Sequence, residues 1–293
     1  MTLFIQQVVD GIASGVIYAA LALALVLIYR SMTLVNVAQG EMAMFSTYIA
    51  WQLTAWGLPI ALAAPLVVGI SLLGGMAVER VVIRPVQHRS VLDVLVVTLG
   101  LLLIFNSAAG AIWGTTAKRL PSLFPDDTVA IGGVTFGLET LGIVAVLLVV
   151  CGALAALFRF TSIGLAMRAT TSNRESARLC GIPAHRMLML GWGLAAALGG
   201  LAGVLIAPRV FLDPNMMLGV LVYAFAATAL GGFDSPLGAV IGGVIVGVVE
   251  NLAGVYVGFI GTDLKVLVPL ILIVGVLLVR PRGLLGSPRV ARV

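Results

Sequence analysis

Residues 42–78 read MAMFSTYIAWQLTAWGLPIALAAPLVVGISLLGGMAV, a run of 37 residues without a single Asp, Glu, Lys or Arg. A helix that crosses a bilayer needs about 20 mainly apolar residues at about 1.5 Å each, so this run is too long for one crossing. Near its middle, Trp56-Gly57-Leu58-Pro59 supplies the residue types of a turn. The run therefore predicts two membrane-spanning helices joined by a short connection.

The rest of the chain continues this pattern. Further apolar runs that are free of charge, or nearly so, lie at 11–29, 94–117, 140–158, 187–208, 214–233 and 235–279. The last is long enough to divide near 258–263, which gives about nine spans, with eight to ten as the range. The segments 31–50 and 214–235 are also compatible with broken or re-entrant helices. We expect an all-α, polytopic transmembrane bundle that forms a single domain over residues 1–293.

The composition excludes most other classes of protein. Of the 293 residues, 61% are apolar and only 10% are charged, whereas a soluble domain has about 45–50% and about 25%. A soluble enzyme and a nucleic-acid-binding protein are therefore excluded. Cys151 and Cys180 are isolated and fit no metal-binding or disulfide pattern. The first ten residues contain no Lys or Arg, so we expect no cleaved signal peptide and a first span that is retained.

The basic residues predict the orientation. If the C-terminus is cytoplasmic, nine spans place the N-terminus outside and put 13 of the 17 Lys and Arg residues on the cytoplasmic side. The four basic residues on the outer side are Lys118, Arg119, Arg209 and Lys265. Because basic residues concentrate in cytoplasmic loops, this orientation is favoured over its inverse.

The longest outer segment is 118–139. Within it, Val129–Ile131, Gly132-Gly133 and Val134–Phe136 are typical of a small β-hairpin with a two-residue turn. The segment is either a connecting loop or a docking surface for an outer partner.

Small residues recur four positions apart in several predicted spans. The pairs are Gly199/Gly203, Gly238/Gly242, Gly243/Gly247 and Gly254/Gly258. Such spacing allows helix backbones to approach closely in lipid, so a tightly packed bundle is expected.

Few polar groups lie within the predicted spans. The candidates for a translocation path are Asn36, Gln39, Glu41, Asn106, Glu250 and Asn251. Ionisable groups inside a membrane are costly and often functional, and Glu250 lies deepest in its run. The same groups also serve as polar links between helices, and both interpretations stay open. The sequence has no phosphate-binding loop and no cluster of catalytic or metal-ligating residues.

The most distinctive cytoplasmic segment is the loop 159–186. Ser172 followed by Glu175 has the spacing of a capping box, which predicts a helix start, while Gly181 and Pro183 predict its end. The intervening helix has about two turns, with Ala177, Leu179 and Cys180 as its apolar surface. Because isolated helices this short are marginal in water, it must pack against something, either its own bundle and the lipid headgroups or a cytoplasmic partner.

These residues resemble a known family. Glu175-Ser176-Ala177 and, three residues later, Gly181 are similar to the E-A-A-x-x-x-G coupling loop of ABC importer permeases, with Ser in place of the second Ala. The segments 164–182, 34–41 and 229–239 resemble the branched-chain amino-acid permeases in particular. The match is spread along nearly the whole chain, whose length suits the shorter of the two permeases of such systems.

The resemblance implies a set of partners and a place in the cell. These are a second, related permease, two cytoplasmic ATPase subunits, a periplasmic binding protein and the lipid of a bacterial inner membrane. The chain itself would be non-catalytic and carry no cofactor, because ATP and Mg²⁺ belong to the ATPases. The residues expected to couple to the ATPases are Arg168, Ser172, Asn173, Arg174, Glu175, Ala177 and Gly181.

Two alternatives remain at this point. The same architecture could carry urea, short amides or a sugar, since no residue in the sequence identifies the transported substrate directly. A stand-alone secondary carrier or channel that uses Glu250 is the alternative from another class. A membrane-embedded enzyme would need a nucleophile–base pair or a metal cluster, and the sequence offers neither.

Overall fold

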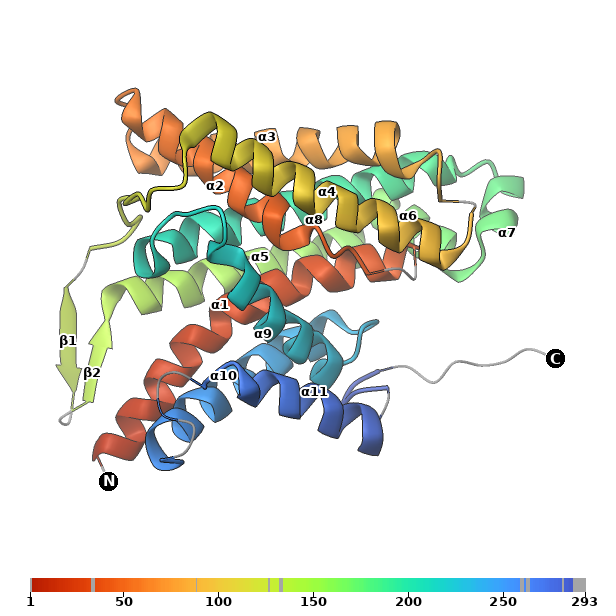
Figure 1. Ribbon diagram of the computed structural model, residues 1–293. Coiled ribbons are helices and arrows are strands. Elements are labelled where there is room, and N and C mark those ends of the chain that lie inside the picture. The colour runs from red at the N-terminus through yellow and green to blue at the C-terminus, as the bar shows by residue number, and fades with distance from the viewer. Residues whose placement is uncertain are drawn as a thin grey trace. The chain divides into compact units, whose positions relative to one another are not determined.

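The computed structural model describes residues 2–32, 35–87, 89–125, 127–131, 134–258, 261, 264–280 and 282–286 (Figure 1). The chain folds as two compact units that are interleaved along the sequence. Unit 1 contains residues 1–26, 124–144 and 218–293, and unit 2 contains residues 27–123 and 145–217. The single domain expected over 1–293 stays a prediction.

Helices account for almost all of the regular structure. They are α1 (Thr2–Met32), α2 (Gln39–Ala55), α3 (Ile60–Val78), the π-helical segment η1 (Glu79–Ile83), α4 (Val91–Trp113), α5 (Leu138–Phe160), α6 (Ser162–Ser172), α7 (Arg174–Leu179), α8 (Ala184–Val210), α9 (Met216–Gly231), α10 (Pro236–Tyr256) and α11 (Leu267–Val279). The predicted turn at Trp56–Pro59 is confirmed, because α2 ends before it, α3 begins after it and Gly57 has a φ of 94°.

The polytopic helical class is confirmed. In the described part of the chain, 6 helices are long and apolar enough to cross a membrane, and α9 and α11 are shorter apolar helices. Helix α2 has 17 residues and also falls short of a full crossing. The exact count of nine spans and the orientation stay predictions, whereas short or broken helices at 31–50 and 214–235 agree with these lengths.

The predicted hairpin is present as strands β1 (Thr128–Ile131) and β2 (Val134–Gly137), which Figure 1 shows as a pair of arrows. They pair antiparallel, with Val129 opposite Phe136 and Ile131 opposite Val134. The turn residues Gly132 and Gly133 lie outside the described residues.

The core of unit 2 consists of α2, α3 and α8, which contact one another. Small residues of α8 allow this contact. A Cβ on Gly199 would lie 2.6 Å from Nε2 of Gln39, and one on Gly200 would lie 2.6 Å from Oγ of Ser71. Gly203 faces the Thr47 side chain and the Ala43 backbone in the same way. The close approach predicted for Gly199 and Gly203 is therefore confirmed.

In unit 1, α1 and α10 cross at glycines. A Cβ on Gly15 would lie 2.7 Å from the backbone of both Gly243 and Val244, and Gly247 faces the backbones of Gly11 and Gly15. The pair Gly243/Gly247 thus functions as predicted, and Gly238 and Gly242 likewise face the backbone of α9. The prediction for Gly254/Gly258 is wrong as a backbone contact, because Gly254 faces the Lys265 side chain and Gly258 faces open space.

Candidate functional site

The predicted coupling loop folds into two short helices, α6 and α7, which pack on each other and on α8. Thr161 caps α6 by accepting a hydrogen bond from the Gly164 backbone N–H at 3.0 Å. A Cβ on Gly164 would meet the backbones of Leu157 and Phe158, so only glycine allows α6 to fold back so closely on the end of α5.

The residue that begins α7 differs from the prediction. Ser172 is the last residue of α6, and Asn173, with extended backbone (φ −154°, ψ 109°), is the N-cap of α7. The Asn173 Oδ1 accepts from the backbone N–H groups of Glu175 and Ser176, both at 3.0 Å. The capping box assigned to Ser172 and Glu175 is therefore wrong. Asn is as good a cap as Ser, and the length of α6 decides between them.

The end of α7 is as predicted. Gly181 has a φ of 80°, its N–H donates to the Arg178 carbonyl, and the Ile182 N–H donates to the Ala177 carbonyl, each at 3.0 Å. This pair of bonds is a Schellman motif with glycine at its left-handed position. Ala177 is buried against the neighbouring helices, whereas Leu179 is 89% exposed. The helix thus packs on its own unit through Ala177 and presents Leu179 outward.

Arg174 ties α7 to the segment after η1. Its Nη2 donates to Oε1 of Gln87 at 2.8 Å, while its Nε is buried without a hydrogen-bond partner. Burial lowers the pKa of the Arg174 guanidinium, and the nearby charge of Arg178 lowers it further. Nearby, the buried carboxylate of Glu79 forms an ion pair with Arg84 at 2.9 Å. Arg174 therefore connects α7 to the segment that follows η1.

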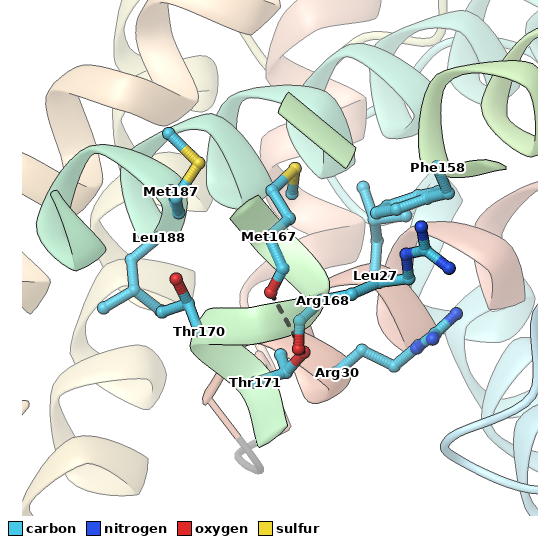
Figure 2. A pocket seen from close by; sticks show the side chains of 9 residues that line it. All are labelled: Leu27, Arg30, Phe158, Met167, Arg168, Thr170, Thr171, Met187 and Leu188. Atoms are coloured by element: carbon cyan, nitrogen blue, oxygen red, sulfur yellow. Dashed lines mark hydrogen bonds between the residues drawn. The ribbon is translucent and has the colours of Figure 1, made fainter. Parts of the chain in front are cut away.

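Arg168 lies on the exposed side of α6 beside a small cavity (Figure 2). Figure 2 shows Arg30, Arg168 and Phe158 toward one side of this cavity and Met187 and Leu188 toward the other. The Arg30 guanidinium lies 5.8 Å from the centre of the Phe158 ring. The cavity volume of about 20 Å³ is enough for one water molecule, so this is not an organic substrate site.

In unit 1, Glu250 of α10 is held by two tyrosines. The Tyr18 hydroxyl donates to Oε2 of Glu250 at 2.8 Å, and the Tyr223 hydroxyl also hydrogen-bonds the carboxylate. The two tyrosine rings stack with their centres 4.5 Å apart. The next residue, Asn251, donates to the Gln7 carbonyl at 3.2 Å. Each of these groups links α10 to α1 or α9.

In unit 2, Glu41 lies in the first turn of α2 and is only 1% exposed. Its Oε2 accepts from Nδ2 of Asn106 at 3.4 Å, a long hydrogen bond, and its Oε1 has no partner. Asp213 lies within Coulombic range of this carboxylate. Seven residues along α2, the buried Tyr48 hydroxyl is also without a hydrogen-bond partner.

Asn36 and Gln39 hydrogen-bond to each other and to neighbouring backbone. Asn36 Oδ1 accepts from the Ala38 N–H at 3.0 Å, and its Nδ2 donates to Oε1 of Gln39 at 3.3 Å. Gln39 Nε2 donates in turn to the Ala195 carbonyl of α8 at 2.9 Å. These two side chains fix the start of α2 against α8, which positions Glu41.

The polar path candidates therefore form two separate sets. Glu41 and Asn106 meet in unit 2, and Glu250 and Asn251 lie in unit 1. Sequence reasoning missed Tyr18, Tyr48 and Asp213. A weak signal existed for Tyr18 and Tyr223, because the segments 15–19 and 219–224 share a Gly and a Tyr-Ala pair. No group of three or more His, Cys, Asp or Glu residues suited to a metal ion occurs in the described ranges.

Comparisons with known proteins extend over nearly the whole chain. The family model described as branched-chain amino acid transport system / permease component matches residues 7–277. The high-affinity branched-chain amino acid transport system permease protein LivH of Escherichia coli K12 is 31% identical, over 99% of this chain and 98% of its own. The corresponding protein BraD of Pseudomonas aeruginosa is 29% identical over 99% and 98%. Among solved structures, PsaBC from Streptococcus pneumoniae in complex with Fab matches at a TM-score of 0.47 and 13% identity, over 94% of this chain and 91% of that one.

Proposed function

Because the chain belongs to the family of branched-chain amino acid transport permease components, we propose that it forms half of the translocation path of an ATP-driven importer for these amino acids. It is a multi-pass membrane protein and a permease subunit, a class that is generally non-catalytic. A second, related permease would complete the path. Two ATPase subunits and a periplasmic binding protein would complete the importer in a bacterial inner membrane.

The single observation that carries this proposal is helix α7. It has only 6 residues, and it is closed at its start by Asn173 and at its end by Gly181. So short a helix is marginal by itself, which explains why both ends are capped. Its Leu179 is apolar and is 89% exposed, so none of the elements that the structure describes covers it. A cleft in an ATPase subunit that receives α7 and Leu179 would account for both features.

The packing supports a route for the motion. α7 contacts α6 and α8, and α8 in turn packs against α3 and α2 along most of unit 2. Arg174 adds a polar link to Gln87, just beyond η1. A displacement of α7 by closing ATPases would therefore move α8 and the end of α3, and would change access to the path by tilting these helices.

The coupling assignment is tested by a matched pair of substitutions. Gly181 and Gly57 both have positive φ, 80° and 94°, and a Cβ on either faces open space. Gly181→Val and Gly57→Val each introduce about 1–3 kcal/mol of backbone strain, so general destabilisation is similar. The chain is co-expressed with the second permease and the ATPases and extracted in mild detergent. Recovery of the ATPase subunits and ATP hydrolysis are then measured.

We expect Gly181→Val to lose the ATPase subunits and ATP-dependent leucine uptake in proteoliposomes, while Gly57→Val retains the ATPases. Glu175→Lys, which reverses the charge at the start of α7, is expected to behave like Gly181→Val. Full retention of ATPases and uptake by both α7 variants would refute the coupling role. Leucine uptake by the chain alone, driven by an ion gradient, would favour a secondary carrier instead.

A further inference from the structure

The surroundings of Glu41 are rich in acceptors and poor in donors. The two hydrogens of Asn106 Nδ2 face three acceptors: Glu41 Oε2 at 3.4 Å, the Pro214 carbonyl at 2.8 Å and Asn215 Oδ1 at 3.3 Å. Glu41 Oε1 receives no hydrogen bond at all. Because a buried carboxylate oxygen without a partner costs free energy, this arrangement favours a ligand that brings donors.

The charge around Glu41 has the same sign as Glu41 itself. Asp213 lies within Coulombic range of both Glu41 and the Tyr48 hydroxyl, and the other contributions at Glu41 are burial and the neutral amide of Asn106. Two acidic side chains near a neutral amide attract positive charge. The Asp213 carboxylate also accepts from the Asn215 N–H at 2.7 Å, which holds the loop 211–215 in place beside Asn106.

The site lies at membrane depth. Asn106 is well inside α4, a 23-residue helix that is long enough to cross the bilayer. Glu41 and Asn215, which both meet Asn106, lie at the start of α2 and just before the start of α9. Helices that begin at this depth leave non-helical backbone there, which membranes tolerate only inside protein or along a water-filled path. In transporters, such interrupted helices surround substrate sites.

An aromatic surface lies on the two helices that supply Glu41 and Asn106. Tyr48 stacks on Trp113 with ring centres 5.0 Å apart, and Phe45 packs edge-on against Phe105 at 5.3 Å and against Trp113 at 5.2 Å. These rings come from α2 and α4, the helices that also supply Glu41 and Asn106. Aromatic faces attract cations and also pack against aliphatic chains. The site therefore combines an anionic end with an apolar wall.

We propose that Glu41, with Asn106 hydrogen-bonded to it and Tyr48 two turns further along α2, binds the primary ammonium group of the transported amino acid at mid-membrane, while the aromatic surface receives the aliphatic side chain. This assignment rests on the proposed function. The ammonium supplies three donors, which matches the unpartnered oxygen of Glu41 and the surplus acceptors at Pro214 and Asn215. Glu41 would thus offset the cost of removing the ammonium from water during passage.

The test uses the whole importer in proteoliposomes, with wild type, Glu41→Gln and Glu41→Asp. The initial rate of ATP-dependent leucine uptake and the ATP hydrolysis stimulated by the binding protein are measured together. Glu41→Gln keeps the size but removes the charge and replaces one acceptor oxygen with an NH2 donor, whereas Glu41→Asp keeps the charge and both acceptor oxygens. We expect Gln to lower uptake about 10- to 100-fold, the value of one charge-assisted hydrogen bond, and Asp to lower it less. Both variants should still assemble with the ATPase subunits, which shows that the permease is folded.

A merely structural Glu41 would give the opposite order, because the isosteric amide would replace it better than the shorter acid. Uptake at the wild-type rate by Glu41→Gln, or faster uptake by Glu41→Gln than by Glu41→Asp, would therefore overturn the ammonium-binding role of Glu41. Neither result would bear on the proposed function of the chain. A wild-type complex that hydrolyses ATP but takes up no leucine would overturn the proposed cargo and this assignment together.

A second measurement does not depend on uptake. The purified complex, without binding protein, is heated with 3-methylbutylamine, which keeps the ammonium and the branched chain of leucine, or with 4-methylpentanoate, which lacks the ammonium. We expect the amine to raise the midpoint of thermal unfolding of the wild type but not of Glu41→Gln, and the acid to raise neither. Equal effects of amine and acid, or stabilisation by sodium ions alone, would overturn the assignment.

Discussion

The two buried carboxylates, Glu41 in unit 2 and Glu250 in unit 1, differ in what surrounds them. Glu250 receives hydroxyl donors from Tyr18 and Tyr223, and Lys265 provides a favourable charge. Glu41 receives one long hydrogen bond, has one oxygen without a partner and faces the like charge of Asp213. The Glu250 carboxylate thus has donors from two other helices, whereas the Glu41 carboxylate has an oxygen that no donor reaches. Depth in an apolar run singled out Glu250, whereas the supply of hydrogen-bond partners distinguishes Glu41.

The largest effect is expected when α1 and α10, the helices that carry Tyr18 and Glu250, are forced apart. Gly247 of α10 faces the backbones of Gly11 and Gly15 with no room for a Cβ. Gly247→Val would separate α1 from α10 by at least a side-chain layer and remove the contact that brings Tyr18 to Glu250. We expect loss of the assembled complex, measured as recovery of a monodisperse peak after detergent extraction.

Gly275 of α11 provides the matched control, because a Cβ there meets nothing within 4 Å. Gly275→Val has the same change in volume and helix propensity, so it should leave recovery close to wild type. Equal recovery of the two variants would mean that the α1–α10 contact does not hold unit 1 together.

The next prediction separates the roles of the two carboxylates. Glu250→Ala leaves the hydroxyls of Tyr18 and Tyr223 without their acceptor, at a cost of about 1–3 kcal/mol. Glu250→Gln keeps an acceptor and should fold nearly as well as wild type. Thermal unfolding of the purified complex measures both. Leucine uptake by Glu250→Gln should stay within about twofold of wild type, whereas Glu41→Gln should lower it about 10- to 100-fold. Loss of uptake by a stable Glu250→Gln complex would return Glu250 to the translocation path.

Features that depend on neighbouring residues were predictable from the sequence. The turn at Trp56–Pro59, the strands around 129–136 and the end of α7 at Gly181 are each specified by residues within a few positions. The start of α7 was misassigned by one residue, because Ser172 and Asn173 are both good caps and only the extent of α6 distinguishes them.

The partners of the carboxylates were not predictable in this way. Tyr18 and Glu250 are 232 residues apart, and Glu41 and Asn106 are 65 residues apart. Their pairing depends on which helices meet, and a single sequence does not fix that choice. The composition of the runs gave the class of fold, but the supply of donors to each carboxylate emerges only from the packing.

A smaller effect is expected from the charges that flank the two sites. Asp213→Asn removes the second negative charge near Glu41 and keeps an oxygen for the Asn215 N–H. Loss of an interaction of about 1 kcal/mol would lower leucine uptake about fivefold. Lys265→Gln, the matched change near Glu250, should leave uptake unchanged and affect only thermal stability. A larger loss of uptake in Lys265→Gln than in Asp213→Asn would contradict the distinction between the sites.

The smallest effect concerns the same substitution made once in each unit. Tyr18→Phe removes a hydroxyl that donates to Glu250 at 2.8 Å, and should lower the free energy of unfolding by about 0.5–1.5 kcal/mol. Tyr48→Phe removes a buried hydroxyl that has no hydrogen-bond partner and is 0% exposed. Because that group loses its hydration on folding and gains nothing in return, its removal should leave stability unchanged or raise it. Thermal unfolding without substrate measures both variants, and a greater loss for Tyr48→Phe would show that the Glu41 site is already complete without a ligand.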